Sequence, residues 1–254
     1  MRISACVITL NEEDRIVHAI ESARGVCDEI VVVDGGSTDR TVELARGAGA
    51  TVYERPFDDF TPQKNFANAR AQHPWILSLD ADERVSQELA DELRRLTAAE
   101  PDQNIAAFSF PRHTYYLGRL IRHNWYPEIK PRLFRRDCAR WAGDFVHEGL
   151  KVEGRVERLR GPVLHYTYRD ISDQVRRMDF YSGRAAHKMF AAGKRTALFG
   201  YTILPVWTFL RFYLIGGGFL DRWPGFVIAA MSAYYVMLKH LKLREMLAER
   251  SVRP

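Results

Sequence analysis

The sequence of 254 residues is poor in cysteine, and its N-terminus lacks the layout of a secretory signal. Cys6, Cys27 and Cys138 are widely spaced and form no CxxC pair, which favours reduced thiols in a cytosolic setting over a disulfide framework. The opening stretch MRISACVITLNEED turns acidic after about ten residues, so we expect no signal peptide. Low-complexity tracts and internal repeats are also absent. The length and a hydrophobic content of 46% suit one large domain, or one domain with an appendage.

Positive charge is in modest excess, because 37 Lys and Arg residues face 32 Asp and Glu residues and give a net charge of +5. Such an excess indicates an anionic partner, for which nucleic acid, a phosphorylated ligand and an acidic membrane surface are the candidates. Residues 112–140 concentrate the charge, with eight Lys or Arg residues against two acids. No RNA-binding motif accompanies this segment, so we expect no nucleic-acid partner. Its tyrosines and tryptophans can instead stack on sugar rings.

Strand-type and helix-type patterns alternate through the first hundred residues. Helices are expected after Asn11, after the GGSTD turn, after a Thr61 cap followed by Pro62, and through the Leu89–Leu93 stripe. This alternation predicts an α/β fold with a mixed, mainly parallel sheet flanked by helices. The strand-type runs are residues 2–9, 29–34, 51–55 and 75–80.

The pattern changes twice further along the chain. Residues 105–170 contain short β-type runs between Gly, Pro and charged residues, which predict an antiparallel extension of the sheet. From residue 171 the chain becomes helical and basic, and then strongly apolar. We therefore expect a catalytic or binding domain over 1–170 and a helical extension over 171–254.

Polar side chains stand at the expected carboxyl ends of three strands, at Asn11, Asp34 and Asp80. Open sheets of this kind bind ligands beyond those ends. Asp80 and Asp82 form a D-x-D pair, and a hard divalent cation such as Mg²⁺ or Mn²⁺ would offset their mutual repulsion. An exposed acidic turn is the alternative for this pair taken alone. A calcium EF-hand is excluded, because no third Asp and no Gly follow at the required spacing.

Four ordered motifs carry a resemblance to a known family: VITLNEE near the N-terminus, VVVDGGSTD, QKNFA at 63–67 and LDADE at 79–83. Together they resemble the inverting family-2 glycosyltransferases of GT-A fold, over roughly residues 1–170. The downstream VHEGL, the LHYTY run and the apolar tail narrow the resemblance to bacterial lipopolysaccharide-core β-glucosyltransferases. The resemblance implies a nucleotide-sugar donor, a divalent cation (Mg²⁺ or Mn²⁺) and a GT-A-type sheet.

The resemblance also implies roles for individual residues. Asp82 would ligate the metal, with His165 completing the site, and Glu148 would be the general base. An acceptor hydroxyl must lose a proton in a single displacement, so the base and the metal-binding acids must be separate groups. The residues that would border the nucleotide, ribose and diphosphate of the donor are Thr9, Asn11, Glu12, Asp34, Lys64, Asn65 and Asp80.

Structural roles compete with several of these assignments. Asp34 can merely cap the following helix, Lys64 can be a solvated helix residue, and His165 can be a satisfied core histidine. Glu148 can pair with a nearby arginine instead of acting as a base. On charge grounds alone, Arg112 and Arg132 are candidates for contacts with the acceptor or a phosphate.

The apolar tail consists of residues 197–220 and 223–238, followed by a basic end. Pro205, Arg211 and the Gly216–Gly218 break interrupt the first segment, and the second is short of the roughly 20 residues that span a bilayer. Aromatic residues and flanking cations favour helices lying in the membrane interface, attached peripherally to the cytoplasmic face of a bacterial inner membrane. Buried core or dimer helices and a re-entrant hairpin are the alternatives.

The sequence therefore predicts a metal-dependent inverting hexosyltransferase, with glucose from UDP-glucose as the expected donor sugar. Its expected acceptor is an anionic lipid-linked saccharide such as a lipopolysaccharide inner core. One alternative is a polyprenyl-phosphate acceptor. The other is a catalytically idle, membrane-associated binding or scaffold protein on the same fold.

Overall fold

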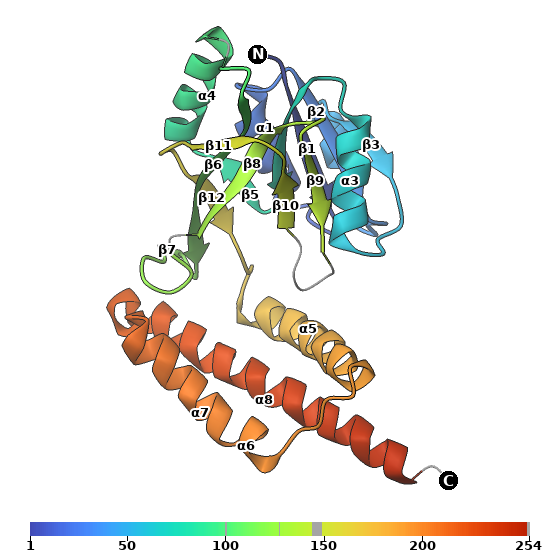
Figure 1. The fold of residues 1–254 in the computed structure, drawn as a ribbon, viewed down its shortest axis with the longest axis vertical. Helices are drawn as coiled ribbons and strands as arrows, with labels where there is room; N and C mark the ends of the chain where they lie inside the picture. The colour runs from blue at the N-terminus through green and yellow to red at the C-terminus, as the bar shows by residue number, and fades with distance from the viewer. Residues whose placement is uncertain (100, 127, 144–148, 253–254) are drawn as a thin grey trace. The chain divides into compact units, whose positions relative to one another are not determined.

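The computed structural model describes residues 1–99, 101–126, 128–143 and 149–252. The chain divides into two compact units (Figure 1), and each is described by itself. The sheet unit comprises Met1–His113 and Pro127–His165. The helical unit comprises Thr114–Tyr126 and Tyr166–Pro254.

Strands and helices alternate up to β4, the short strand β5 then precedes α4, and only strands follow from there to β12. The elements in chain order are β1 (Ile3–Thr9), α1 (Ile16–Arg24), β2 (Glu29–Asp34), α2 (Thr41–Gly47), β3 (Thr51–Glu54), α3 (Phe60–Arg70), β4 (Trp75–Asp80), β5 (Glu83–Val85), α4 (Gln87–Ala99), β6 (Ile105–Tyr116), β7 (Arg119–Leu120), β8 (Glu128–Arg135), β9 (Ala139–Ala142), β10 (Gly149–Val152), β11 (Arg155–Arg158) and β12 (Val163–Tyr166).

The main sheet has the strand order β3-β2-β1-β4-β8-β6-β12-β5. Its first four strands run parallel, whereas β8 pairs antiparallel with both β4 and β6. The predicted mixed α/β architecture is confirmed, and so is the antiparallel extension after residue 105. β11 departs from that extension, because it pairs parallel with β6.

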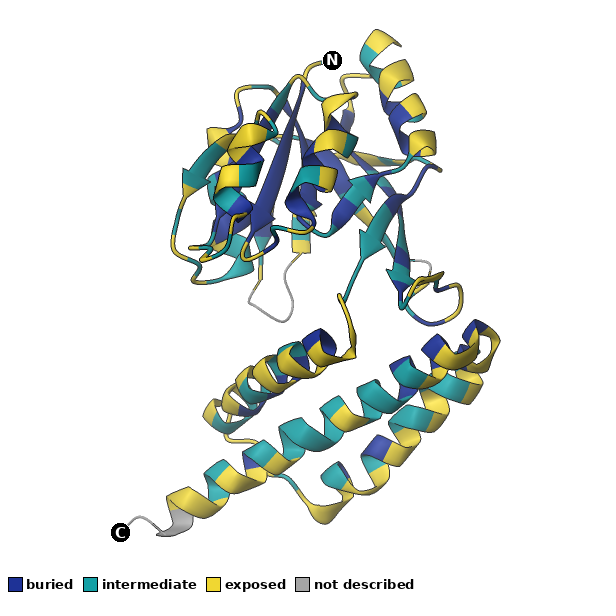
Figure 2. Ribbon diagram, turned by 180° about the vertical axis from the view of Figure 1, so that it is seen from behind, coloured by how far each residue is buried: buried dark blue, intermediate teal, exposed yellow. Residues whose placement is uncertain are grey.

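Helices cover both faces of the parallel strands because each strand buries both rows of its side chains. One row of β1, including Ile3 and Val7, packs with Ile16 and Ile20 of α1 and with α4. The other row of β1 packs against α3. Figure 2 shows the buried residues gathered along these strands. The result is a three-layer arrangement in which the ends of the central strands carry the polar residues.

Two helix starts differ from the sequence-based prediction. α1 begins at Ile16 and not after Asn11, because Asn11 adopts a left-handed backbone with φ of 54°. The cap of α3 is Asp59, whose extended backbone lets its carboxylate accept from the Phe60 N–H at 2.6 Å. Thr61 was the expected cap, but its hydroxyl donates to the Gly143 carbonyl at 3.2 Å.

The helical unit is built around α8 (Arg222–Val252), with α5 (Ile171–Ala191) and α7 (Ile203–Leu210) packed along it. The first apolar segment is not one continuous helix. It breaks into α6 (Leu198–Tyr201), α7, the π-helix η1 (Arg211–Ile215) and the 3₁₀ helix η2 (Gly218–Asp221). The second apolar segment joins the basic end in α8.

The loop after β7 is part of the helical unit and is held by buried polar contacts. Asp221 accepts from the backbone N–H groups of Arg122 and His123 at 3.0 and 3.1 Å, and its carboxylate lies 2.9 Å from His123 Nδ1. Asn124 Nδ2 donates to the carbonyl of Phe212 at 3.0 Å, at the π-helix. These bonds satisfy backbone groups that the irregular turn leaves open.

Large apolar side chains remain exposed on the helices of this unit. One helix in the described part of the chain, Gly218–Arg250, is long and apolar enough to cross a membrane by length and composition. In its most apolar window, 17% is buried inside the protein. Large apolar side chains that are at least half exposed are Phe180, Leu198, Phe199, Ile203, Val206, Trp207, Leu214, Ile215, Phe219, Leu220 and Trp223.

Candidate active site

The carboxyl ends of β2, β1 and β4 meet at one edge of the sheet. The register places Thr9 beside Asp34, and Ile8 beside Asp80. Parallel strands of this order necessarily bring their terminal side chains together. Three of the predicted donor-binding positions are therefore neighbours on the backbone.

Asp34 and Asn11 shape the loop after β2. The buried Asp34 carboxylate accepts from the N–H groups of Gly36 and Ser37, at 2.8 Å each, and from the Ser37 hydroxyl. Asn11 Oδ1 accepts from the Thr38 N–H at 2.8 Å. Both predicted nucleotide residues thus hold the loop that would form a wall of a nucleotide site.

Thr9 and Glu12 are both buried beside that loop. The Thr9 hydroxyl has no hydrogen-bond partner among the described residues. Glu12 lies 3.6 Å from Arg15, and the same guanidinium lies 4.0 Å from Asp82. Sequence reasoning missed Arg15, which links the first strand–helix turn to the D-x-D turn across about seventy residues of sequence.

Asp80 is held by two cations from other elements. Lys64 Nζ of α3 lies 3.2 Å from one carboxylate oxygen, and Arg132 Nη2 of β8 lies 3.5 Å from the other. Burial raises the pKa of Asp80, but Lys64, Arg132 and Arg112 outweigh it and hold that pKa well below its ordinary value. The resulting stabilisation is present above the ordinary carboxylate pKa and is lost as the pH falls through the lowered one.

Lys64 is almost fully buried, at 3% side-chain exposure, which removes the solvated-helix alternative. Its ammonium lies 4.5 Å from the centre of the Trp141 ring, an arrangement typical of cation–π attraction. Asn65 fixes that tryptophan through two backbone bonds, since its Nδ2 donates to the Trp141 carbonyl at 2.9 Å and its Oδ1 accepts from the Trp141 N–H at 3.0 Å. Asn65 therefore ties β9 to α3, a role the motif alone did not reveal.

Glu83 is a second residue of this site, after Arg15, to which the sequence analysis assigned no role. Its buried carboxylate accepts from the Asp80 N–H at 3.0 Å and closes the acidic turn. The other oxygen lies 3.4 Å from Arg112 and 3.5 Å from Arg132. Glu83 and Asp80 share Arg132, so the closeness of these acids is offset by protein cations.

Asp82 and His165 form the remaining pair. β12 runs antiparallel to β5 with His165 opposite Glu83, which brings the imidazole Nε2 to 3.5 Å from Asp82 Oδ2. Both side chains are mostly buried, at 16% and 13% exposure. A carboxylate suits Mn²⁺ or Mg²⁺, whereas an imidazole suits Mn²⁺ better than Mg²⁺, and phosphate oxygens of a substrate commonly supply further ligands. The residue types thus fit a divalent cation, although no cluster of three potential ligands occurs among the described residues.

Two predicted site residues remain, Arg112 and Glu148. Arg112 reaches Glu83 on one side and Glu128 on the other. Glu148, the predicted base, lies outside the described residues.

Replacing Glu83 tests whether the ion pairs of the acidic turn stabilise the fold. Glu83→Gln keeps an acceptor for the Asp80 N–H but removes the charge that faces Arg112 and Arg132. We expect it to lower the free energy of unfolding by about 1–3 kcal/mol, because the buried Arg132 and the partly buried Arg112 lose a partner. Urea unfolding monitored by circular dichroism measures the change.

Glu43→Gln is the matched control, since Glu43 pairs with Arg40 at the exposed surface. We expect no measurable change in stability for this variant. Equal stability of the Glu83 and Glu43 variants would contradict the account of the turn.

Comparisons with known proteins agree on one family. The protein-family model described as glycosyl transferase family 2 matches residues 4–151 of the sequence. An uncharacterized glycosyltransferase of Rickettsia typhi is 32% identical, covering 96% of this chain and 87% of the relative. The lipopolysaccharide core biosynthesis glycosyltransferase LpsC of Rhizobium meliloti is 34% identical, covering 95% of this chain and 91% of the relative.

The solved structures that resemble this chain share less sequence with it than the relatives above. Glucosyl-3-phosphoglycerate synthase from Mycobacterium tuberculosis, in complex with Mn²⁺ and UDP, has a TM-score of 0.47 at 16% identity. The alignment covers 77% of this chain and 81% of that one. A structure of TarS from S. aureus has a TM-score of 0.46 at 16% identity, covering 99% of this chain and 92% of that one.

Proposed function

The chain belongs to glycosyltransferase family 2, and we propose that it is a metal-dependent, inverting hexosyltransferase that uses a UDP-sugar and an anionic, lipid-linked saccharide acceptor. The observation that carries this proposal is the acidic turn at the end of β4. There Lys64 and Arg132 hold Asp80, while Asp82 and His165 face each other. Cations beside acids at the carboxyl edge of a parallel sheet suit a nucleoside diphosphate and a divalent ion.

In this proposal the nucleoside of the donor lies against the loops after β1 and β2. Thr9, Asn11, Glu12 and Asp34 border it, and the Thr9 hydroxyl, which has no partner among the described residues, offers a hydrogen-bonding group. Asp80 faces the ribose. Lys64 and Asn65 lie on the diphosphate side, where the ammonium of Lys64 attracts phosphate oxygens.

Asp82 and His165 would hold the divalent cation in company with the donor diphosphate. The ion stabilises the negative charge that the leaving nucleoside diphosphate gains. The protein's own cations prepare the same side of the site, because Lys64 and Arg132 keep Asp80 ionised and fixed.

We assign proton removal from the acceptor hydroxyl to Glu148. Among the described carboxylates near the site, Glu128 would be a poor alternative. Burial raises the pKa of Glu128, but Lys130 and Arg112 outweigh it and lower that pKa below its ordinary value. A carboxylate stabilised in its charged form is a weak base.

Two observations support the proposed acceptor: the basic charge of residues 112–140 and the name of one relative. LpsC of Rhizobium meliloti is named for lipopolysaccharide core biosynthesis, and the match runs nearly the full length of both chains. A lipopolysaccharide inner core is anionic and membrane-bound, which suits the basic segment 112–140 of this chain. Glucose stays the proposed sugar. We also propose that residues 1–170 are the catalytic domain and residues 171–254 a membrane-associated extension.

A donor and acceptor screen tests the function. We expect transfer from UDP-glucose to a lipopolysaccharide core acceptor in the presence of Mn²⁺ or Mg²⁺, and little transfer in a chelator. Asp82→Asn and Glu148→Gln should each lower kcat/KM by about 100-fold or more, because they remove a metal ligand and the base. Radiolabelled sugar transfer, with product analysis, measures this.

Asp91→Asn is the control for a carboxylate-to-amide change, because Asp91 lies half exposed on α4. Wild-type turnover by either site variant would overturn that residue's assignment. A sugar–polyprenyl phosphate product would show that the acceptor is a polyprenyl phosphate and not a saccharide. The absence of any metal-dependent UDP binding would favour the scaffold alternative.

We further propose peripheral attachment to the cytoplasmic face of a bacterial inner membrane through the exposed apolar side chains of α6, α7 and η1–η2. On α7, Ile203, Val206 and Trp207 are more than half exposed, and their removal from water into lipid is favourable. Basic residues at the end of α8 add attraction to anionic lipid.

Flotation with anionic vesicles tests the attachment. The Ile203→Glu/Trp207→Glu double variant should lower the vesicle-bound fraction about tenfold or more, since each buried apolar side chain contributes about 1.5–3 kcal/mol. Val156→Glu is the control, because Val156 is exposed on β11 of the sheet unit. Unchanged flotation of the double variant would contradict attachment by α7.

A further inference from the structure

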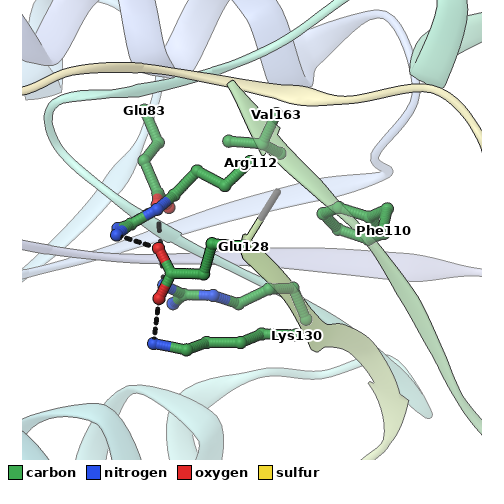
Figure 3. Close-up of a pocket in the computed structure, with 7 residues that line it drawn as sticks. Glu83, Phe110, Arg112, Glu128, Lys130 and Val163 are labelled. Atoms are coloured by element: carbon green, nitrogen blue, oxygen red, sulfur yellow. Dashed lines mark hydrogen bonds and ion pairs between the residues drawn. The ribbon is translucent and has the colours of Figure 1, made fainter. Parts of the chain in front are cut away.

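A pocket beside the acidic turn has a charged wall that the donor assignments leave unused. It is formed within the sheet unit, on the face shared by β8, β6 and β12 (Figure 3). Phe110 and Val163 provide an apolar floor. The charged lining residues are Glu83, Arg112, Glu128, Lys130 and Arg132.

The strand register explains why these charges gather. Glu128, Lys130 and Arg132 alternate along β8 and therefore share one face of the strand. Arg112 lies opposite Glu128 in the β6–β8 pair, and Phe110 lies opposite Lys130. Three cations and two carboxylates thus line one small space. Arg132 also pairs with Asp80, so Arg112 and Lys130 are the cations left to the outer part of the pocket.

The two carboxylates are held very differently. Glu83 is 1% exposed and is committed to the Asp80 N–H, Arg112 and Arg132. Glu128 is 26% exposed and bridges Arg112 Nη2 and Lys130 Nζ at the open side of the pocket. In Figure 3 its carboxylate lies between those two cations. Lys130 itself is 57% exposed, so this bridge is accessible from solvent.

Arg112 retains a donor beyond these ion pairs. Its Nε–H is buried and has no hydrogen-bond partner among the described residues. An unpaired buried donor costs free energy that a ligand oxygen would recover. A guanidinium with an open donor, next to an ammonium, is suited to phosphate or carboxylate.

We propose that this pocket binds an oxyanion of the acceptor, a phosphate ester or a sugar-acid carboxylate, and that Glu128 occupies the place of that anion until the acceptor displaces it. The inference rests on the proposed function, because it assumes an acceptor next to the donor site. It deepens that function by naming the chemical class that the acceptor must carry and the residues that select it.

Because Glu128 competes with the anion, the proposal predicts opposite changes in anion affinity when a cation or Glu128 is replaced. Removing a cation weakens anion binding, whereas removing the charge of Glu128 strengthens it, because the internal competitor no longer holds Arg112 and Lys130. A pocket whose ion pairs are purely structural predicts no such gain. A neutral acceptor would gain nothing from these cations, so the arrangement also selects against uncharged saccharides.

Equilibrium dialysis of the full chain with radiolabelled inorganic phosphate tests this, in detergent with saturating UDP and Mg²⁺ to fill the donor site. We expect Arg112→Gln and Lys130→Gln to weaken phosphate binding about tenfold or more, the loss expected for a charge-assisted contact. Glu128→Gln should tighten it at least several-fold. Lys151→Gln, an equal charge change at an exposed position of β10, should leave it unchanged.

Three results would overturn the proposal. They are phosphate binding unaffected by Glu128→Gln, equal binding by the Arg112 and Lys151 variants, and a loss of UDP affinity in Arg112→Gln at least as large as its loss of phosphate affinity, which would assign the pocket to the donor. If Arg112→Gln fails to fold, the phosphate affinity of Glu128→Gln still tests the proposal, because only a displaced internal competitor predicts that it rises. Competition by acetate identifies a carboxylate, and its failure identifies a phosphate ester.

The proposed function can fail separately. Phosphate binding with these mutational signs, in a protein that does not bind UDP, would sink the transferase proposal and leave the oxyanion site standing.

Discussion

The pairing of Asp80 with Lys64 and Arg132 is the interaction on which the rest of the site depends. A carboxylate at the end of a buried strand is costly unless cations from other elements meet it. Here α3 supplies Lys64 and β8 supplies Arg132, so a helix and two neighbouring strands of the sheet are joined at one charge. The same pairing keeps Asp80 ionised and leaves Asp82 to turn toward His165.

Arg132 extends this arrangement beyond the donor side. It contacts Asp80 and Glu83 together, and Glu83 in turn contacts Arg112 of the pocket. The donor edge of the sheet and the proposed oxyanion pocket therefore share one continuous set of charges. Filling either site changes the field at the other, which offers a physical route by which donor and acceptor binding would influence each other.

The sequence predicted the strands and the positions of Asp34, Asp80 and Asp82 well, because strand ends follow from local apolar runs. It did not predict the partners. Arg15 and Glu83 depend on the packing of α1 and on the register of β5, β6 and β8, which no local pattern encodes. The bonds from both ends of the Asn65 amide to the Trp141 backbone were not predicted either, and its expected place near the diphosphate stays a prediction. The site roles stay predictions until they are measured.

Isothermal titration of UDP, with and without Mn²⁺, into wild type and Lys64→Met tests the central claim most directly. Lys64 has 3% side-chain exposure and is the cation nearest Asp80 in α3. The account predicts Mn²⁺-dependent UDP binding by wild type and an affinity at least about tenfold weaker in the variant, the loss of one charge-assisted contact. Equal UDP affinity in a folded Lys64→Met protein, or binding that ignores Mn²⁺, would contradict it.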